Sequence, residues 1–147
     1  MSEDVVLARA TIESVKSNVV KGQDPEGKCW SWNNTLAREL RDRGVQAMVF
    51  GSPHYEFKNR KSGVGRGHWL TIIKLQEEWM AVDLSSGQIE GLDSEKEWSA
   101  DSLEELCRQV EASLPRFIYY RPELESEFVS ATERELEKGR GFKERWS

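Results

Sequence analysis

The sequence predicts an α+β fold in a single domain of residues 1–147. Apolar residues recur at helical spacing in residues 4–21 and again from Cys29 to Arg43, which indicates two amphipathic helices. Three short apolar or aromatic stretches between residues 45 and 87 are typical of strands. Helical periodicity returns after residue 102, so predicted helices precede and follow a small sheet.

Each of the two N-terminal helices has an apolar face and a glycine at its end. Gly22 interrupts the first helix, and Gly44 is placed to adopt the left-handed conformation that ends the second, which begins near Cys29. The expected buried faces are Ala8, Ile12, Val15 and Val19 in the first helix, and Cys29, Trp32, Leu36 and Leu40 in the second.

The predicted sheet contains strands at 45–51, 67–75 and 77–87, the last two joined by a turn at Gln76–Glu78. The strand after Gly67 is almost entirely apolar, so we expect both of its faces to be covered. The basic, glycine-containing stretch from His54 to Arg66 is expected to be a loop, either a solvated one or a rim that guides a substrate.

The C-terminal part is predicted to contain a helix, a strand and a second helix. Ser102 and Glu105 form a capping-box pattern at the start of the first helix, which Pro115 ends. Residues 116–121 are apolar and aromatic enough to predict a strand, and the charged stretch from Pro122 to Gly139 predicts the last helix.

Composition excludes several classes of protein. With 37% hydrophobic and 32% charged residues, the chain can bury one core, and no apolar run approaches the roughly 18 residues of a membrane helix. The N-terminus lacks the basic and apolar regions of a signal peptide, so we expect a cytoplasmic protein, or an effector or toxin delivered by a non-Sec route. Two cysteines are too few for a disulfide framework or a multi-cysteine metal site.

Charge is unevenly distributed along the chain. Residues 1–92 are balanced, and residues 93–147 carry the whole net charge of −5. An acidic C-terminal third argues against nucleic acid as a partner, because phosphate binding needs a concentrated basic face. This region is most simply a solvated face, and a partner protein is the alternative.

Three residues form a candidate catalytic triad: Cys29 at a helix start, His68 at a strand start and Asp83 near the end of the next strand. A helix N-terminus and a nearby imidazolium both stabilise a thiolate, and a carboxylate fixes the tautomer and orientation of the imidazole. Reflection about the turn at 76–78 places residue 68 opposite about residue 85 or 86, close to Asp83 in an antiparallel pair.

The order Cys29, His68, Asp83 resembles that of papain-like and transglutaminase-like cysteine enzymes. Gln23, six residues before Cys29-Trp30, resembles the papain-type stretch in which a glutamine precedes the nucleophile. The segment GKCWSWNNTLARELRDRGVQAMVFGS, followed by His68-Trp69 and by Trp79 four residues before Asp83, is similar to the transglutaminase-like core. The resemblance covers residues 23–86.

This resemblance implies a cysteine-bearing helix on a small antiparallel sheet, to which C-terminal helices are added here. It also implies an oxyanion hole formed by the Gln23 side chain and the Cys29 backbone N–H. The implied enzyme is a compact one, of the bacterial transglutaminase-like, papain-fold toxin or glutamine deamidase type. It would act on amide bonds of a protein or peptide through a thioester, as a protease, deamidase or transglutaminase, without a metal or organic cofactor.

Other interpretations remain open at this point. A non-catalytic binding module could retain the fold, and acyl transfer from a small thioester donor, as in arylamine N-acetyltransferases, uses the same triad order. Asp83 could simply cap the turn that follows it. Asn33 and Asn34 are expected to lie on the helix surface or to contact the catalytic residues from behind, rather than to act in catalysis. His54 is a poorer candidate base than His68, and Cys107 is predicted to be a core residue.

Overall fold

The computed structural model describes residues 3–23, 28–60, 63–86, 96–115, 117, 118 and 120–146; the side chains of 53–60, 63–66 and 138–146 are outside this description. It is an α+β structure built on one four-stranded antiparallel sheet with the strand order β1-β2-β3-β4. The strands are β1 (Gln46–Arg60), β2 (Gly63–Lys74), β3 (Trp79–Asp83) and β4 (Lys96–Ala100). The helices are α1 (Glu3–Val15), continued by a π-helical turn η1 (Lys16–Val20), α2 (Cys29–Asp42), α3 (Leu103–Ser113) and α4 (Glu123–Trp146).

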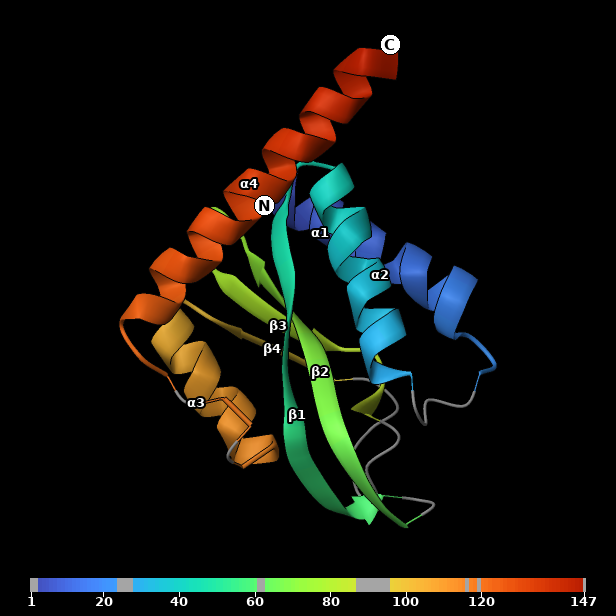
Figure 1. Cartoon of the computed structure of the whole chain (residues 1–147), viewed down its shortest axis with the longest axis vertical. Coiled ribbons are helices and arrows are strands. Elements are labelled where there is room, and N and C mark those ends of the chain that lie inside the picture. Colours follow the sequence, from blue (N-terminus) through green and yellow to red (C-terminus); the bar gives the residue numbers. More distant parts are fainter. Residues whose placement is uncertain are drawn as a thin grey trace.

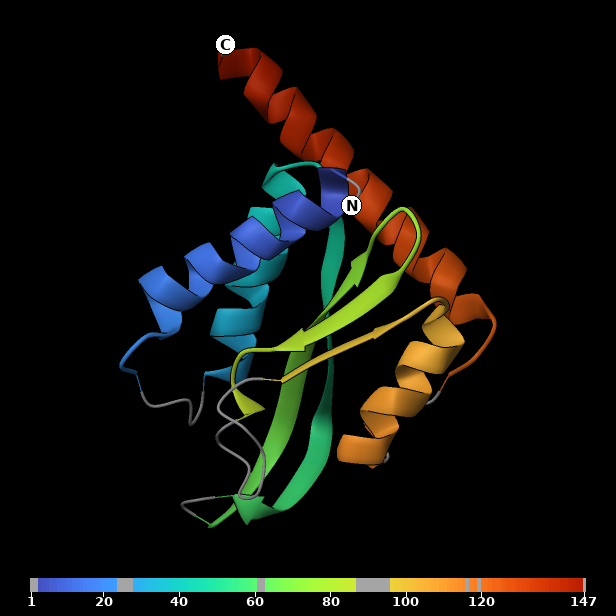
Figure 2. The same cartoon turned by 180° about the vertical axis from the view of Figure 1, so that it is seen from behind.

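Helices cover both faces of the sheet. Figures 1 and 2 show α1 and α2 on one side, α3 and α4 on the other, and the C-terminal end of α4 extending past the sheet. Strand side chains alternate between the two layers: Ile73 and Val82 pack with α1 and α2, whereas Ile72 and Ala81 pack with α3 and α4. This alternation follows from the two-residue period of a strand and explains the unbroken apolar run in β2.

The register of β2 and β3 matches the sequence prediction. Lys74 pairs with Trp79 and Thr71 with Val82, across a tight turn in which Leu75 N–H donates to the Glu78 carbonyl over 2.9 Å. Continued to the start of β2, this register brings residue 68 opposite residue 85. The strand arithmetic that paired His68 with the region of Asp83 is thereby confirmed.

The helix limits also follow from local chemistry. α2 starts at Cys29 as expected, and Gly44 ends the helix with a φ of +86°, which side-chain-bearing residues rarely adopt. At the start of α3 the Ser102 hydroxyl accepts from Glu105 N–H over 3.2 Å, confirming the predicted cap. α4 begins one residue after the predicted Pro122 and continues beyond Gly139.

Two predictions of local structure were wrong, and one strand was missed. The stretch from His54 to Arg66 is largely strand, because β1 and β2 continue as a long antiparallel pair. The register of this pair shifts between Ser52 and Glu56 and again between Phe57 and Arg60, as at a β-bulge. Residues 117, 118, 120 and 121 are not in a strand; Phe117 and Ile118 are apolar because they fill the core between α3 and α4. β4 was not predicted, because only Trp98 among its five residues is buried.

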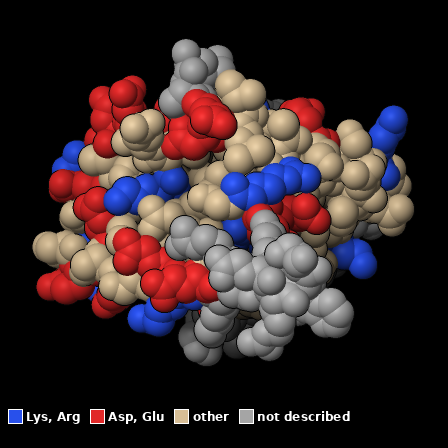
Figure 3. Space-filling view, turned by 90° about the horizontal axis from the view of Figure 1, so that it is seen from above, with Lys and Arg blue, Asp and Glu red and all other residues tan. Residues whose placement is uncertain are grey.

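Charged side chains of both signs are interspersed among the residues described on the face drawn in Figure 3. The side chains of the basic stretch at 54–66 lie outside the description, so its role as solvated segment or rim stays a prediction. Over the described residues, no helix combines the length and apolar character needed to cross a bilayer.

Candidate active site

The N-terminus of α2 places Cys29 against the start of β2. Cys29 is the first residue of the helix and only 6% exposed, and its Sγ lies 3.8 Å from the Gly67 carbonyl oxygen. Gly67 has a φ of +84°, a conformation that favours glycine, and directly precedes His68. The Gly67 backbone therefore lies beside the Cys29 thiol, and the His68 imidazole follows directly in the chain.

His68 and Asp83 form a fully buried pair on neighbouring strands. His68 Nε2 and Asp83 Oδ2 are 2.6 Å apart, and both side chains have no exposed surface. The imidazole also hydrogen-bonds with the Cys29 side chain. Because Asp83 engages Nε2, Nδ1 is the ring nitrogen available to the sulfur. The three predicted triad residues are thus brought together in the order thiol, imidazole, carboxylate.

The environment of His68 favours its charged form. Burial alone lowers the pKa of an imidazole, but the charge of Asp83 and its hydrogen bond, followed by the hydrogen bond and charge of Cys29, outweigh this effect. Together they raise the pKa of His68 from 6.5 to about 9. An imidazolium between a carboxylate and a sulfur is the electrostatic arrangement that stabilises a thiolate near neutral pH.

Asp83 holds the imidazole and also caps the turn after β3. Its Oδ1 accepts from Ser85 N–H over 2.9 Å and from the Ser85 hydroxyl over 3.0 Å, while Oδ2 faces His68. The two roles that the sequence offered for Asp83 are therefore combined in one carboxylate. Three hydrogen bonds fix its orientation, and that in turn fixes the ring of His68.

The proposed oxyanion donors are described in part. Gln23 lies in the exposed bend after η1, where its N–H donates to the Val20 carbonyl over 3.0 Å, and residues 24–27 between it and α2 are outside the description. Cys29 N–H belongs to the first turn of α2, where amide groups have no intrahelical acceptor. The pairing of these two donors stays a prediction.

Several aromatic side chains lie beside the site or in the core next to it. Trp32 and Trp79 are buried in the core, whereas Trp30, beside Cys29, is 52% exposed and packs edge-on against Trp69 at 5.9 Å between ring centroids. The Phe117 ring contacts His68 in the same manner at 5.6 Å. Its role could not be predicted, because residues 116–121 resemble a strand in sequence.

The second cysteine has the properties of a core residue. Cys107 is 2% exposed in α3, and burial, together with the charge of Glu111, raises its thiol pKa to about 11. It packs with Leu103, Leu106 and Val110. Among the residues that the structure describes, no three histidine, cysteine or acidic side chains are grouped so that they could hold a metal ion.

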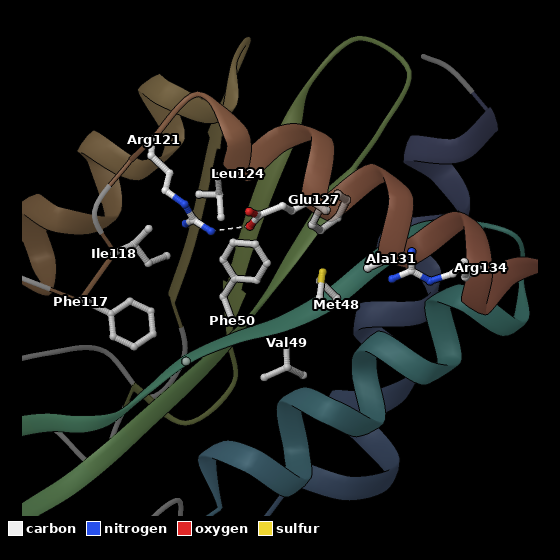
Figure 4. Close-up of a pocket in the computed structure, with 12 residues that line it drawn as sticks. Met48, Val49, Phe50, Phe117, Ile118, Arg121, Leu124, Glu127, Ala131 and Arg134 are labelled. Carbon is white, nitrogen blue, oxygen red and sulfur yellow. Dashed lines mark hydrogen bonds and ion pairs between the residues drawn. The ribbon is translucent and has the colours of Figure 1, made fainter.

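A pocket of about 570 Å³, lined by both apolar and charged side chains, lies between β1 and α4, beside the site (Figure 4). Its wall includes Phe117, whose ring also contacts His68, and an Arg121–Glu127 ion pair crosses its outer side. A smaller pocket of about 260 Å³ extends along β1 to Trp30, next to Cys29. Each pocket is therefore lined by a residue next to the triad: Phe117, which contacts His68, and Trp30, which follows Cys29 in the sequence.

No protein-family model, curated protein or solved structure matches this chain.

Proposed function

We propose that the protein is a cysteine-dependent enzyme that acts on amide or related acyl groups through a thioester intermediate. The proposal rests on one observation: the buried His68 imidazole contacts both the Asp83 carboxylate, with 2.6 Å between Nε2 and Oδ2, and the Cys29 side chain. Such an arrangement costs free energy unless its charges are paired, and here each charge has a partner. A papain-like or transglutaminase-like enzyme uses this order of groups.

In the proposed mechanism His68 Nδ1 holds the proton of Cys29, and the thiolate attacks the substrate carbonyl carbon. The negative charge that develops on the carbonyl oxygen is stabilised by Cys29 N–H and the Gln23 side chain. His68 then gives its proton to the leaving amine, the carbon–nitrogen bond breaks and a thioester remains on Cys29. Asp83 keeps the imidazolium oriented throughout.

The second substrate decides the reaction. Water attacks the thioester with His68 as base, releasing a carboxylic acid, which gives proteolysis of a peptide or deamidation of a glutamine side chain. An amine in place of water gives transamidation. In each case we propose a protein or peptide substrate, and none of these steps requires a metal or organic cofactor.

The experiment compares alkylation of the two cysteines across pH. Iodoacetamide should modify Cys29 well below the pKa of about 8.5 of an ordinary thiol, whereas buried Cys107 should stay unmodified in the native protein. Peptide mass locates each label, and Cys29→Ala and His68→Ala are the matched variants. If Cys29 reacts as an ordinary thiol, and His68→Ala leaves its rate unchanged, a non-catalytic binding module becomes the better account.

A small acyl donor is a second candidate substrate. It is favoured by the low exposure of Cys29, 6%, and of His68, 0%, since an extended peptide needs an open approach to the sulfur. Incubation with a small thioester, and separately with a glutamine-containing peptide, distinguishes the two. Intact mass should show an acyl group on wild-type protein and none on Cys29→Ala.

A further inference from the structure

The amide side chain of Asn33 links the three elements that carry the proposed triad. Asn33 lies one turn after Cys29 in α2 and has no exposed surface. Its Nδ2 donates to the Cys29 carbonyl over 2.9 Å and to the Trp69 carbonyl over 3.1 Å. Its Oδ1 accepts from Leu84 N–H over 3.2 Å.

These contacts are specific to the chain segments around the site. Cys29 is the candidate nucleophile itself, Trp69 directly follows His68, and Leu84 directly follows Asp83. One planar group therefore connects the backbone at or beside each of the three residues. Because a buried amide that loses a partner leaves a backbone group unsatisfied, the network fixes the distances between α2, β2 and the end of β3.

Thr71 completes this network from β2. Its hydroxyl, which is also fully buried, donates to the Asn33 carbonyl over 2.8 Å and lies 3.5 Å from Asn33 Oδ1. The contact holds the backbone of α2 at Asn33 against β2, with the amide oxygen next to the same hydroxyl. Helix packing alone would not require it, since apolar side chains already bury α2 against the sheet.

We propose that Asn33 is a positioning residue that sets the separation between the Cys29 sulfur and the His68–Asp83 pair. This inference rests on the proposed function. Asn33 touches neither the sulfur nor the imidazole in the contacts above, so it acts through the backbone of Cys29, Trp69 and Leu84. Small displacements suffice, because a hydrogen bond between thiol and imidazole weakens steeply with distance and angle.

The test is the pH profile of Cys29 alkylation in Asn33→Ala. At pH 6.5 only about 1% of an ordinary thiol is ionised, so its thiolate concentration is about 100-fold lower than that of a fully ionised cysteine. A more basic thiolate is also the better nucleophile, which offsets about tenfold of that difference in the alkylation rate. We therefore expect the rate at pH 6.5 to fall about tenfold in Asn33→Ala. Thr71→Val, which keeps the side-chain shape, should shift the profile in the same direction by less.

Leu40→Ala is the matched control, because Leu40 is buried in the same helix about three turns from Cys29. It should lower thermal stability without moving the profile, and labelling of Cys107 reports any opening of the fold in each variant. If wild-type Cys29 is activated at low pH and both Asn33→Ala and Thr71→Val keep the wild-type profile, the positioning role is refuted and the proposed function stands. If wild-type Cys29 already behaves as an ordinary thiol, the proposed function fails and this inference with it.

Discussion

Replacing Asp83 with asparagine should remove most of the pH dependence of stability that His68 creates. The folded-state pKa of about 9 exceeds the ordinary value of 6.5, so the folded protein binds a proton more tightly than the unfolded chain. The resulting stabilisation is fully present below pH 6.5 and is lost as the pH rises through about 9. At about 1.4 kcal/mol for each pH unit between the two values, it amounts to about 3 kcal/mol.

Asparagine keeps the size of Asp83 and an oxygen that can accept from Ser85, but it removes the negative charge beside His68 Nε2. That charge is the largest influence raising the His68 pKa, so in Asp83→Asn the pKa should return toward or below its ordinary value. The thiol of Cys29 would ionise in the opposite sense in the folded protein, so the comparison is made in a Cys29→Ser background. There the free energy of unfolding should fall by up to about 3 kcal/mol between pH 6.5 and 9.5, and that of Cys29→Ser, Asp83→Asn by much less.

The assay is urea unfolding of both proteins at half-unit steps over that range, followed by tryptophan fluorescence. Ionisation of Cys107 in the unfolded chain affects both proteins equally, so it cancels in the difference between them. Parallel curves for Cys29→Ser and Cys29→Ser, Asp83→Asn would refute the reasoning, because they would mean that the His68–Asp83 pair does not hold a proton at neutral pH.

Two further predictions test the framework around the site. In Gly51→Ala the added Cβ would lie 1.8 Å from Trp69 Cδ1, so the indole must move. We expect urea unfolding to show a loss of about 1–3 kcal/mol in the free energy of unfolding, together with a changed tryptophan emission. Ser99→Ala, on the exposed side of β4, is the control that should leave both unchanged. Ser102→Ala removes the cap of α3 and should cost about 1 kcal/mol, whereas Ser102→Asp should keep nearly full stability; equal losses in both would show that the Glu105 N–H bond does not stabilise the helix.

Local chemistry accounts for the elements that the sequence predicted well. The limits of α2 could be predicted because Cys29 begins an apolar stripe and Gly44 supplies the left-handed residue that ends the helix. The pairing of β2 with β3 could be counted from the short turn after Leu75. Such features depend on neighbours in the sequence, and for that reason they can be recognised without knowledge of the tertiary structure.

Other features depend on packing between distant segments. Phe117 and Ile118 have the composition of a strand, yet they pack in the core with α3, α4 and the sheet without pairing. β4 carries mostly polar side chains, and its pairing with β3 is made by backbone groups that any sequence possesses.

The same distinction applies to the site. Cys29, His68 and Asp83 could be named from residue type and strand register, but the contact between α2 and β2 that joins the thiol to the imidazole could not be derived. Asn33 was equally consistent with the helix surface and with the interior, since its partners are backbone groups on two strands.

The most direct measurement is the ultraviolet absorbance of the thiolate across pH in Cys107→Ser, with the Cys29→Ser, Cys107→Ser double variant as baseline. An imidazolium held beside the sulfur predicts that Cys29 loses its proton well below the ordinary thiol pKa of about 8.5, so that the absorbance is already present at pH 6.5. A signal that develops only above pH 8.5 would contradict an ion pair between Cys29 and His68.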